Sequence, residues 1–84
     1  MNAHDVKITK AILDVLHDLD GRQASEITLH TEVNIICPCL VGEFETVLKE
    51  CERRRYITGV QGKFTQGRKW NIADAGEAAR IEMA

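Results

Sequence analysis

The sequence of 84 residues has no long apolar run, and no stretch approaches the ~18 consecutive apolar residues that a membrane-spanning helix requires. Its first residues, MNAHD, lack a basic region followed by an apolar run, which is the pattern of a secretory signal. We therefore expect a cytoplasmic protein without a membrane partner. The sequence also has no linker-like segment and no internal repeat, so residues 1–84 are expected to form a single domain.

The residue patterns of catalysis are missing as well. The sequence contains no carboxylate pair in the setting of a pocket, no nucleophile beside a histidine, and no glycine-rich phosphate loop followed by a helix. A domain of this size also has little room for a cleft. We expect neither an enzyme, nor a cofactor, nor a small-molecule substrate.

Cysteine is sparse, and the number of cysteines is odd. Three cysteines cannot all pair within one chain, and free thiols are the expectation in a reducing compartment. Cys37, Cys39, Cys51 and His30 are of the types that bind zinc, but Cys37 and Cys39 bracket one residue, whereas structural zinc sites usually bracket two to four. Cys51 also falls on the buried side of a predicted helix. We expect buried or half-buried thiols and no metal site, and a metal or redox-sensing role for these thiols stays an open alternative.

Acidic residues are missing from one segment, residues 53–72, which contains six basic residues. Residues 1–52 hold ten acidic and four basic residues, and residues 73–84 hold three acidic and one basic, so the net charge of −2 conceals a strong asymmetry. A field of one sign over one segment attracts an oppositely charged partner, and nucleic acid is the obvious polyanion. The six basic residues are Arg53, Arg54, Arg55, Lys63, Arg68 and Lys69.

Three segments have apolar residues at intervals of three and four, which predicts amphipathic helices over residues 5–19, 26–34 and 40–54. The second segment is the most weakly patterned, and we expect its Ile27 to face inward. In the third segment we expect a buried stripe that begins at Leu40.

The pattern changes after the third helix. Residues 56–72 predict a β-hairpin, because β-branched and aromatic residues flank a loop with two glycines. Trp70 and Ile72 are two residues apart, so they share one face of their strand, which is expected to pack on the helices. Asp74, with a glutamate three residues later, resembles a capping box and opens a last helix over residues 74–83. The predicted fold is mainly α with a small β-hairpin, an α+β class, in the order helix, helix, helix, strand, strand, helix.

Two runs, FETVLKECERRRYI at residues 44–57 and WNIADAGEAA at residues 70–79, resemble the winged helix-turn-helix domains of bacterial transcriptional regulators. In that family a helix with a charged end leads into an aromatic-isoleucine strand start and then a hairpin wing. The similarity extends from about Asp5 to Ala79. It implies a DNA-binding protein whose third helix lies in the major groove and whose hairpin touches the DNA backbone or the minor groove.

The resemblance also implies which residues contact double-stranded DNA, on the third helix and on the wing. These residues are Thr46, Lys49, Arg53, Lys63, Arg68 and Lys69. Glu43 and Glu45 put negative charge near the start of the same helix, and Arg, Asn and Gln, the usual base-reading residues, are missing from its first turns. We therefore expect phosphate contacts to supply most of the affinity.

Other interpretations remain open. The basic residues at 53–55 complement a helix dipole in any protein, and charge on a hairpin hinders pairing with another sheet edge.

The acidic third helix would instead suit an interaction or dimerisation module, which docks on another protein or on a second copy. Winged-helix regulators commonly pair through their terminal helices. A homodimer of this kind is compatible with the apolar residues that we expect to be exposed there, which are Val6, Leu13, Ile81 and Met83.

Overall fold

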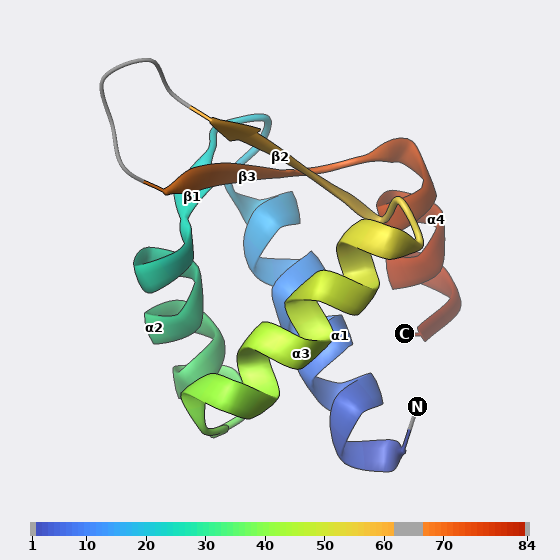
Figure 1. Cartoon of the computed structure of the whole chain (residues 1–84). Coiled ribbons are helices and arrows are strands. Elements are labelled where there is room, and N and C mark those ends of the chain that lie inside the picture. The colour runs from blue at the N-terminus through green and yellow to red at the C-terminus, as the bar shows by residue number, and fades with distance from the viewer. Residues whose placement is uncertain (1, 62–66, 84) are drawn as a thin grey trace.

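Four helices and a three-stranded antiparallel sheet make up the computed structural model, which describes residues 2–61 and 67–83 (Figure 1). The elements are α1 (Ala3–Asp18), β1 (Ala24–Ser25), α2 (Glu26–Ile36), α3 (Val41–Arg53), β2 (Ile57–Gln61), β3 (Arg68–Ile72) and α4 (Asp74–Met83). The predicted α+β class and order of elements are confirmed, with one short strand, β1, added before α2. Lys63, predicted to lie on the wing, is outside the described residues. None of the helices in the described ranges is both long and apolar enough to cross a membrane.

Side chains at the ends of the first two helices determine where these helices begin. Asn2 Oδ1 accepts a hydrogen bond from the backbone N–H of Asp5 at 2.8 Å, so α1 starts slightly before its predicted position. Ser25 Oγ accepts one from the backbone N–H of Thr28 at 3.2 Å at the start of α2. This second helix continues past its predicted end to Ile36, which shortens the connection to α3.

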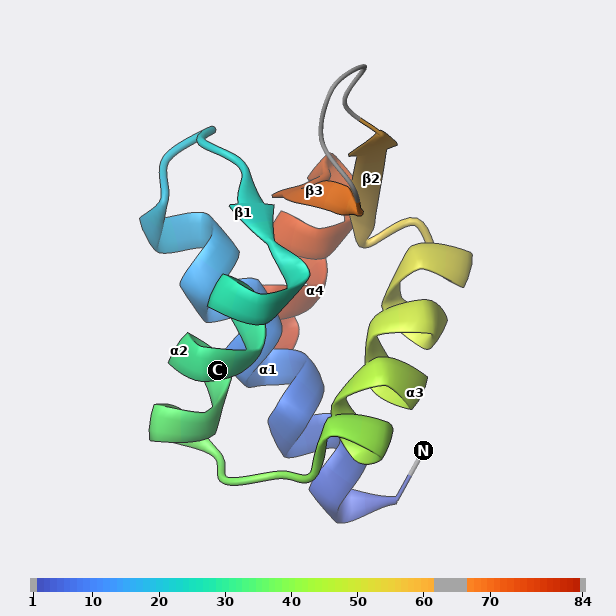
Figure 2. The same cartoon turned by 60° about the vertical axis from the view of Figure 1, so that its left-hand side comes forward.

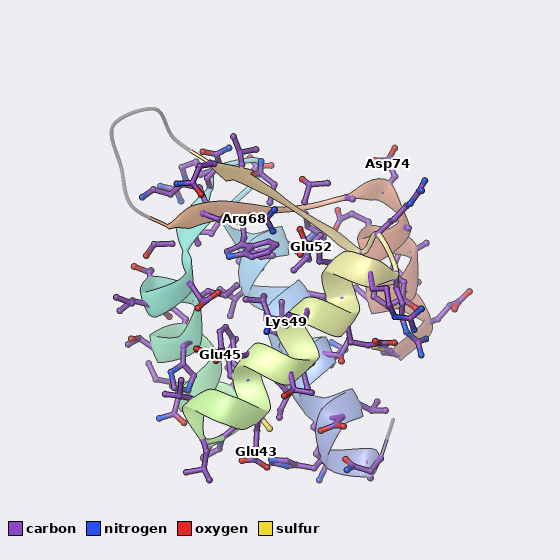
Figure 3. The ribbon with its side chains drawn as sticks, in the orientation of Figure 1. Glu43, Glu45, Lys49, Glu52, Arg68 and Asp74 are labelled. Carbon is purple, nitrogen blue, oxygen red and sulfur yellow. The ribbon has the colours of Figure 1, made fainter. Side chains whose placement is uncertain are left out.

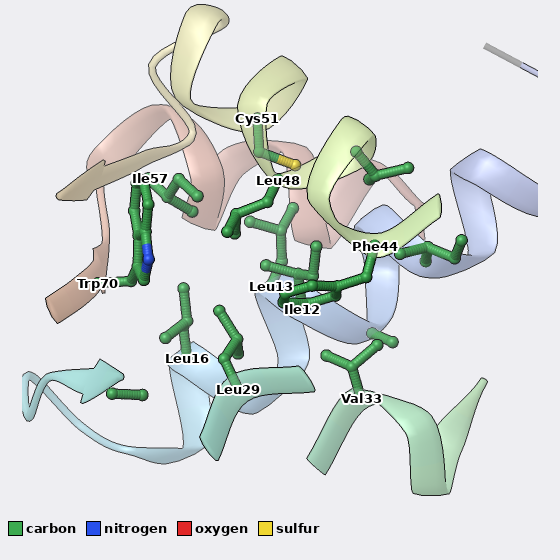
Figure 4. Packing of buried hydrophobic residues seen from close by; sticks show 14 of the residues in the cluster. Ile12, Leu13, Leu16, Leu29, Val33, Phe44, Leu48, Cys51, Ile57 and Trp70 are labelled. Atoms are coloured by element: carbon green, nitrogen blue, oxygen red, sulfur yellow. The ribbon is translucent and has the colours of Figure 1, made fainter. Parts of the chain in front are cut away.

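The hydrophobic core forms where the apolar faces of the helices and the sheet meet around α1 (Figure 4). α1 packs against α2, α3, α4 and β3, so it is surrounded on several sides. The buried stripe of α3 follows the predicted helical spacing. The core residues are Ile8, Ala11, Ile12, Leu13, Leu16, Ala24, Leu29, Val33, Phe44, Val47, Leu48, Cys51, Ile57, Trp70 and Ala79.

Three apolar residues lie where the sequence analysis does not expect them. Ile27 is 82% exposed, because α2 packs through Leu29 and Val33, and Ile27 is about 200° around the helix from Leu29. Leu40 is 74% exposed, because it is the N-cap of α3 and precedes the buried stripe. Leu13, expected at a dimer surface, is fully buried since α1 is covered on several sides. The predictions for these three side chains are wrong.

The sheet has the strand order β1-β3-β2 and covers one end of the helical core (Figure 2). Ala24 pairs with Trp70, and Ile57 pairs with Ile72. Trp70 is buried as predicted, whereas Ile72 is half-buried. Gly59 gives the Trp70 ring room, since a Cβ at this position would lie 2.8 Å from the ring carbon Cζ3.

Two helical glycines allow a test of the packing of α4. At Gly76 a Cβ would collide with the backbone carbonyl of Tyr56, whereas at Gly42 of α3 it would meet no described atom within 4 Å. We expect Gly76→Ala to lower the free energy of unfolding by about 1–3 kcal/mol through overpacking. Gly42→Ala should instead raise it, by up to about 1 kcal/mol, because alanine favours the helix. Urea unfolding followed by circular dichroism measures both, and stabilisation by both changes would contradict the close packing at Gly76.

Candidate nucleic-acid interface

The side of α3 that points away from the core carries polar residues at helical spacing (Figure 3). Thr46, Lys49 and Arg53 follow one another along this side, and all three are exposed. The Thr46 hydroxyl donates a hydrogen bond to the backbone carbonyl of Gly42 at 2.9 Å. Glu45 is exposed on the same helix, next to Thr46 in the sequence. The outward side of α3 therefore mixes cations with carboxylates.

A groove of about 340 Å³ lies between α3 and β3, and we call it the α3–β3 groove. Lys49 lines it from α3 and Arg68 lines it from β3, so two of the predicted DNA-binding residues share one site. Three carboxylates line the same groove. The lining residues are Glu26, Glu45, Leu48, Lys49, Glu52, Arg68 and Trp70.

Arg68 is held in this groove by two neighbours. Its Nη1 donates a hydrogen bond to Glu52 Oε2 at 2.6 Å, and its guanidinium carbon lies 5.6 Å from the centroid of the Trp70 ring. Arg68 and Trp70 are two residues apart on β3, so they point to the same side of the sheet. Both partners of the ion pair are partly exposed, which makes the pair weak because solvent screens it.

The arginines at the end of α3 share one carboxylate. Arg53 Nε donates to Glu50 Oε2 at 2.9 Å, and Arg54 Nε donates to Glu50 Oε1 at 2.9 Å. These hydrogen bonds lower the pKa of Glu50 from 4.5 to about 2, so its negative charge persists and offsets part of the charge of the arginines. Arg55 takes part in none of the ion pairs among the described residues.

Of the described residues predicted to bind DNA, Lys69 lies apart from the others. Lys49 shares the α3–β3 groove with Arg68, and Arg53 lies one turn beyond Lys49 at the end of α3. Lys69 is next to Arg68 on β3, and neighbouring residues of a strand point to opposite faces of the sheet. It is half-buried. The described cations are therefore spread over the end of α3, the groove and the outer face of the sheet.

Of the three carboxylates of the α3–β3 groove, sequence reasoning noted Glu45 but missed Glu26 and Glu52. Glu45 precedes Lys49 by four residues and Glu52 follows it by three, a spacing that brings side chains together on a helix and that was readable from the sequence. Glu26 begins α2. Its presence in the groove depends on how α2 packs beside α3, for which the sequence contains no signal.

The cysteines lie in two different environments. Cys51 is fully buried, and burial raises the pKa of its thiol to about 11. Cys37 and Cys39 are half-buried in the connection between α2 and α3. Burial, together with Cys37 and Glu43, raises the pKa of Cys39. Within residues 2–61 and 67–83, no three His, Cys, Asp or Glu side chains gather in an arrangement that could hold a metal ion.

The fold is similar to those of two solved structures. For smu.1704 from Streptococcus mutans UA159 the TM-score is 0.78, with 17% sequence identity over 94% of this chain and 74% of that chain. For SSV1 F-93 the TM-score is 0.68, with 15% identity over 89% of this chain and 80% of that chain. At these identities the similarity concerns the fold alone, a small winged-helix-like α+β arrangement. No protein-family model and no curated protein matches the sequence.

The carboxylate shared by the arginines gives a testable pKa. We expect Glu50 to titrate near pH 2 in the folded protein, and its pKa to rise when Arg53→Ala and Arg54→Ala are combined, because hydrogen bonds to its ionised form are lost. The pKa of Glu50 is lower in the folded protein than in the unfolded protein, so the ionised carboxylate stabilises the fold at pH values above the unfolded pKa. This stabilisation is lost as the pH falls towards 2. NMR of the carboxyl carbon measures the pKa. Arg55→Ala is the matched control and should leave the pKa of Glu50 unchanged, and an equal rise in both proteins would contradict the assignment.

The burial of the thiols leads to a second prediction. We expect two thiols, those of Cys37 and Cys39, to react with Ellman's reagent in the native protein at pH 8. Cys51 should react only after unfolding in denaturant, because it is buried and its pKa is raised. A metal chelator should change neither number. Three reactive thiols in the native protein would contradict the buried position of Cys51, and a chelator-dependent number would indicate a metal site.

Proposed function

We propose that the protein binds duplex DNA and acts as a small transcriptional regulator. One observation carries the proposal: Lys49 and Arg68 line the same groove, the α3–β3 groove. This groove lies beside the helix that corresponds to the recognition helix of a winged-helix fold. Both side chains are cationic and partly exposed, and they come from the two elements that a winged-helix protein brings to DNA.

Phosphate contacts are the main source of affinity in this proposal. Each cation that neutralises a phosphate releases condensed counterions, which favours binding at low salt. Lys49, Arg55 and Lys69 have no carboxylate partner among the ion pairs of the described residues, so they can contact a phosphate without first breaking an ion pair. Arg53 and Arg68 are exposed and must exchange a carboxylate for a phosphate, which weak surface ion pairs permit.

Base reading contributes little to this mode of binding. The first turns of α3 present Glu43 and Glu45, which repel phosphates on either side of the major groove. Thr46 offers one hydroxyl that already donates to a backbone carbonyl. We therefore expect the protein to discriminate weakly between DNA sequences and to bind DNA with an affinity that depends strongly on salt.

Two substitutions in the α3–β3 groove test the proposal in opposite directions. We expect Lys49→Ala to weaken binding to a short mixed-sequence duplex and to reduce the slope of log affinity against log salt by about one unit. Glu52→Gln should strengthen binding, because it frees Arg68 and removes a negative charge from the groove. Fluorescence anisotropy at several salt concentrations measures both effects.

Lys7→Ala is the matched control for these measurements. Lys7 is an exposed lysine on α1, away from the α3–β3 groove, and its loss should leave the salt slope unchanged. If Lys7→Ala and Lys49→Ala weaken binding equally, the interaction is a general effect of net charge. The proposal would then be wrong, as it would be if the unsubstituted protein shows no salt-dependent binding at all.

A further inference from the structure

A second groove lies between α2 and the first turns of α3, and exposed apolar side chains surround it. We call it the α2–α3 groove. Ile27 is 82% exposed on its α2 side, and Val41 is 56% exposed on its α3 side. Single exposed apolar residues are ordinary, but two such residues on opposite walls of one groove, close to the exposed Leu40, mark a surface suited to an apolar contact.

The floor of this groove is fixed by packing. Phe44 is fully buried, and its ring lies 4.8 Å from the ring of His30, centroid to centroid. His30 is held in turn by its Nε2, which lies 3.2 Å from the backbone oxygen of Cys39. The volume is about 280 Å³, which is room for one or two apolar side chains. The lining residues are Glu26, Ile27, His30, Thr31, Val41, Phe44 and Glu45.

Charge at the rim of the α2–α3 groove selects between kinds of partner. Glu26 and Glu45 both line it, and neither takes part in an ion pair among the described residues. Neither Lys nor Arg lines this groove. Negative charge around an apolar floor attracts a cationic partner with apolar side chains.

We infer that the α2–α3 groove docks a protein segment in which an apolar anchor is flanked by Lys or Arg, such as one face of a basic amphipathic helix. The anchor lies against Phe44 between Ile27 and Val41, and the cations of the segment pair with Glu26 and Glu45. Docking of a helix into an apolar groove is a general mode of peptide recognition. This inference goes beyond the proposed binding of DNA, which uses the neighbouring α3–β3 groove; the two grooves share Glu26 and Glu45.

A titration with a synthetic peptide tests the inference. The probe is an amphipathic helical peptide of leucine and lysine, and the control peptide carries glutamate in place of every lysine. In NMR spectra of the labelled protein we expect the lysine peptide to shift the amide signals of Ile27, Thr31 and Val41, and the glutamate peptide to shift none of them. Ile27→Ser and Glu45→Lys should each weaken binding of the lysine peptide by about tenfold, because one removes an apolar contact and the other a charge contact.

Matched controls are available on the same helix. Ile35 is 74% exposed on α2 and Glu32 is exposed there too, but neither lines the α2–α3 groove. We expect Ile35→Ser and Glu32→Lys to bind the lysine peptide as the unsubstituted protein does. All four positions are exposed, so the variants should keep the fold, which circular dichroism verifies.

Three results would overturn the inference. Equal weakening by the groove variants and their controls would show that the peptide binds through net charge alone. Shifts confined to other surfaces would place the peptide elsewhere. Sedimentation that shows self-association, lost in Ile27→Ser, would identify a second copy of this chain as the occupant. None of these results bears on DNA binding, which Glu45→Lys should strengthen.

Discussion

The packing of α3 on α1 is the interaction on which the rest of the structure depends. Phe44, Val47, Leu48 and Cys51 form one stripe at helical spacing, and this stripe is buried against the central helix. Once it is buried, the rotation of α3 about its own axis is fixed. Every other side chain of α3 then has a determined direction, which brings Glu45 to the rim of both grooves and its later residues towards the sheet. The surface chemistry of the protein follows from the burial of this stripe.

The charges along α3 divide it into two halves. Glu43 lies in the first turn and Arg53 in the last, an order that complements the helix dipole and needs no functional explanation by itself. The two halves of α3 also lie beside different sets of residues. The acidic half borders the apolar α2–α3 groove, whereas Lys49 in the second half lines a groove with Arg68. One helix thus borders two grooves of different chemistry, which share the carboxylates of Glu26 and Glu45.

Much of the fold could be predicted from the sequence, because α1, α3 and the hairpin have strong apolar periodicity and α4 has a capping signal. The errors have local causes. The pattern of α2 is weak, so the sequence did not reveal that Leu29 rather than Ile27 faces the core. The strand β1 has two residues, too few for any strand pattern, and it forms by pairing with β3. Which charged side chains meet was not predictable for pairs from different elements, such as Arg68 and Glu52, which are sixteen residues apart.

The ion pairs of the basic segment limit how strongly it can bind a polyanion. Counting residues gives this segment six positive charges, but Glu50 pairs with Arg53 and Arg54, and Glu52 pairs with Arg68. Both carboxylates come from the acidic part of the sequence, so folding brings negative charge back to the segment. A phosphate must displace a carboxylate to reach each of these arginines. Salt screens both the ion pair that the phosphate breaks and the contact that the phosphate forms. The net gain from each exchange is therefore small. In the proposed binding of DNA, affinity therefore rests mainly on the cations without carboxylate partners, and we expect it to be weak and salt-dependent.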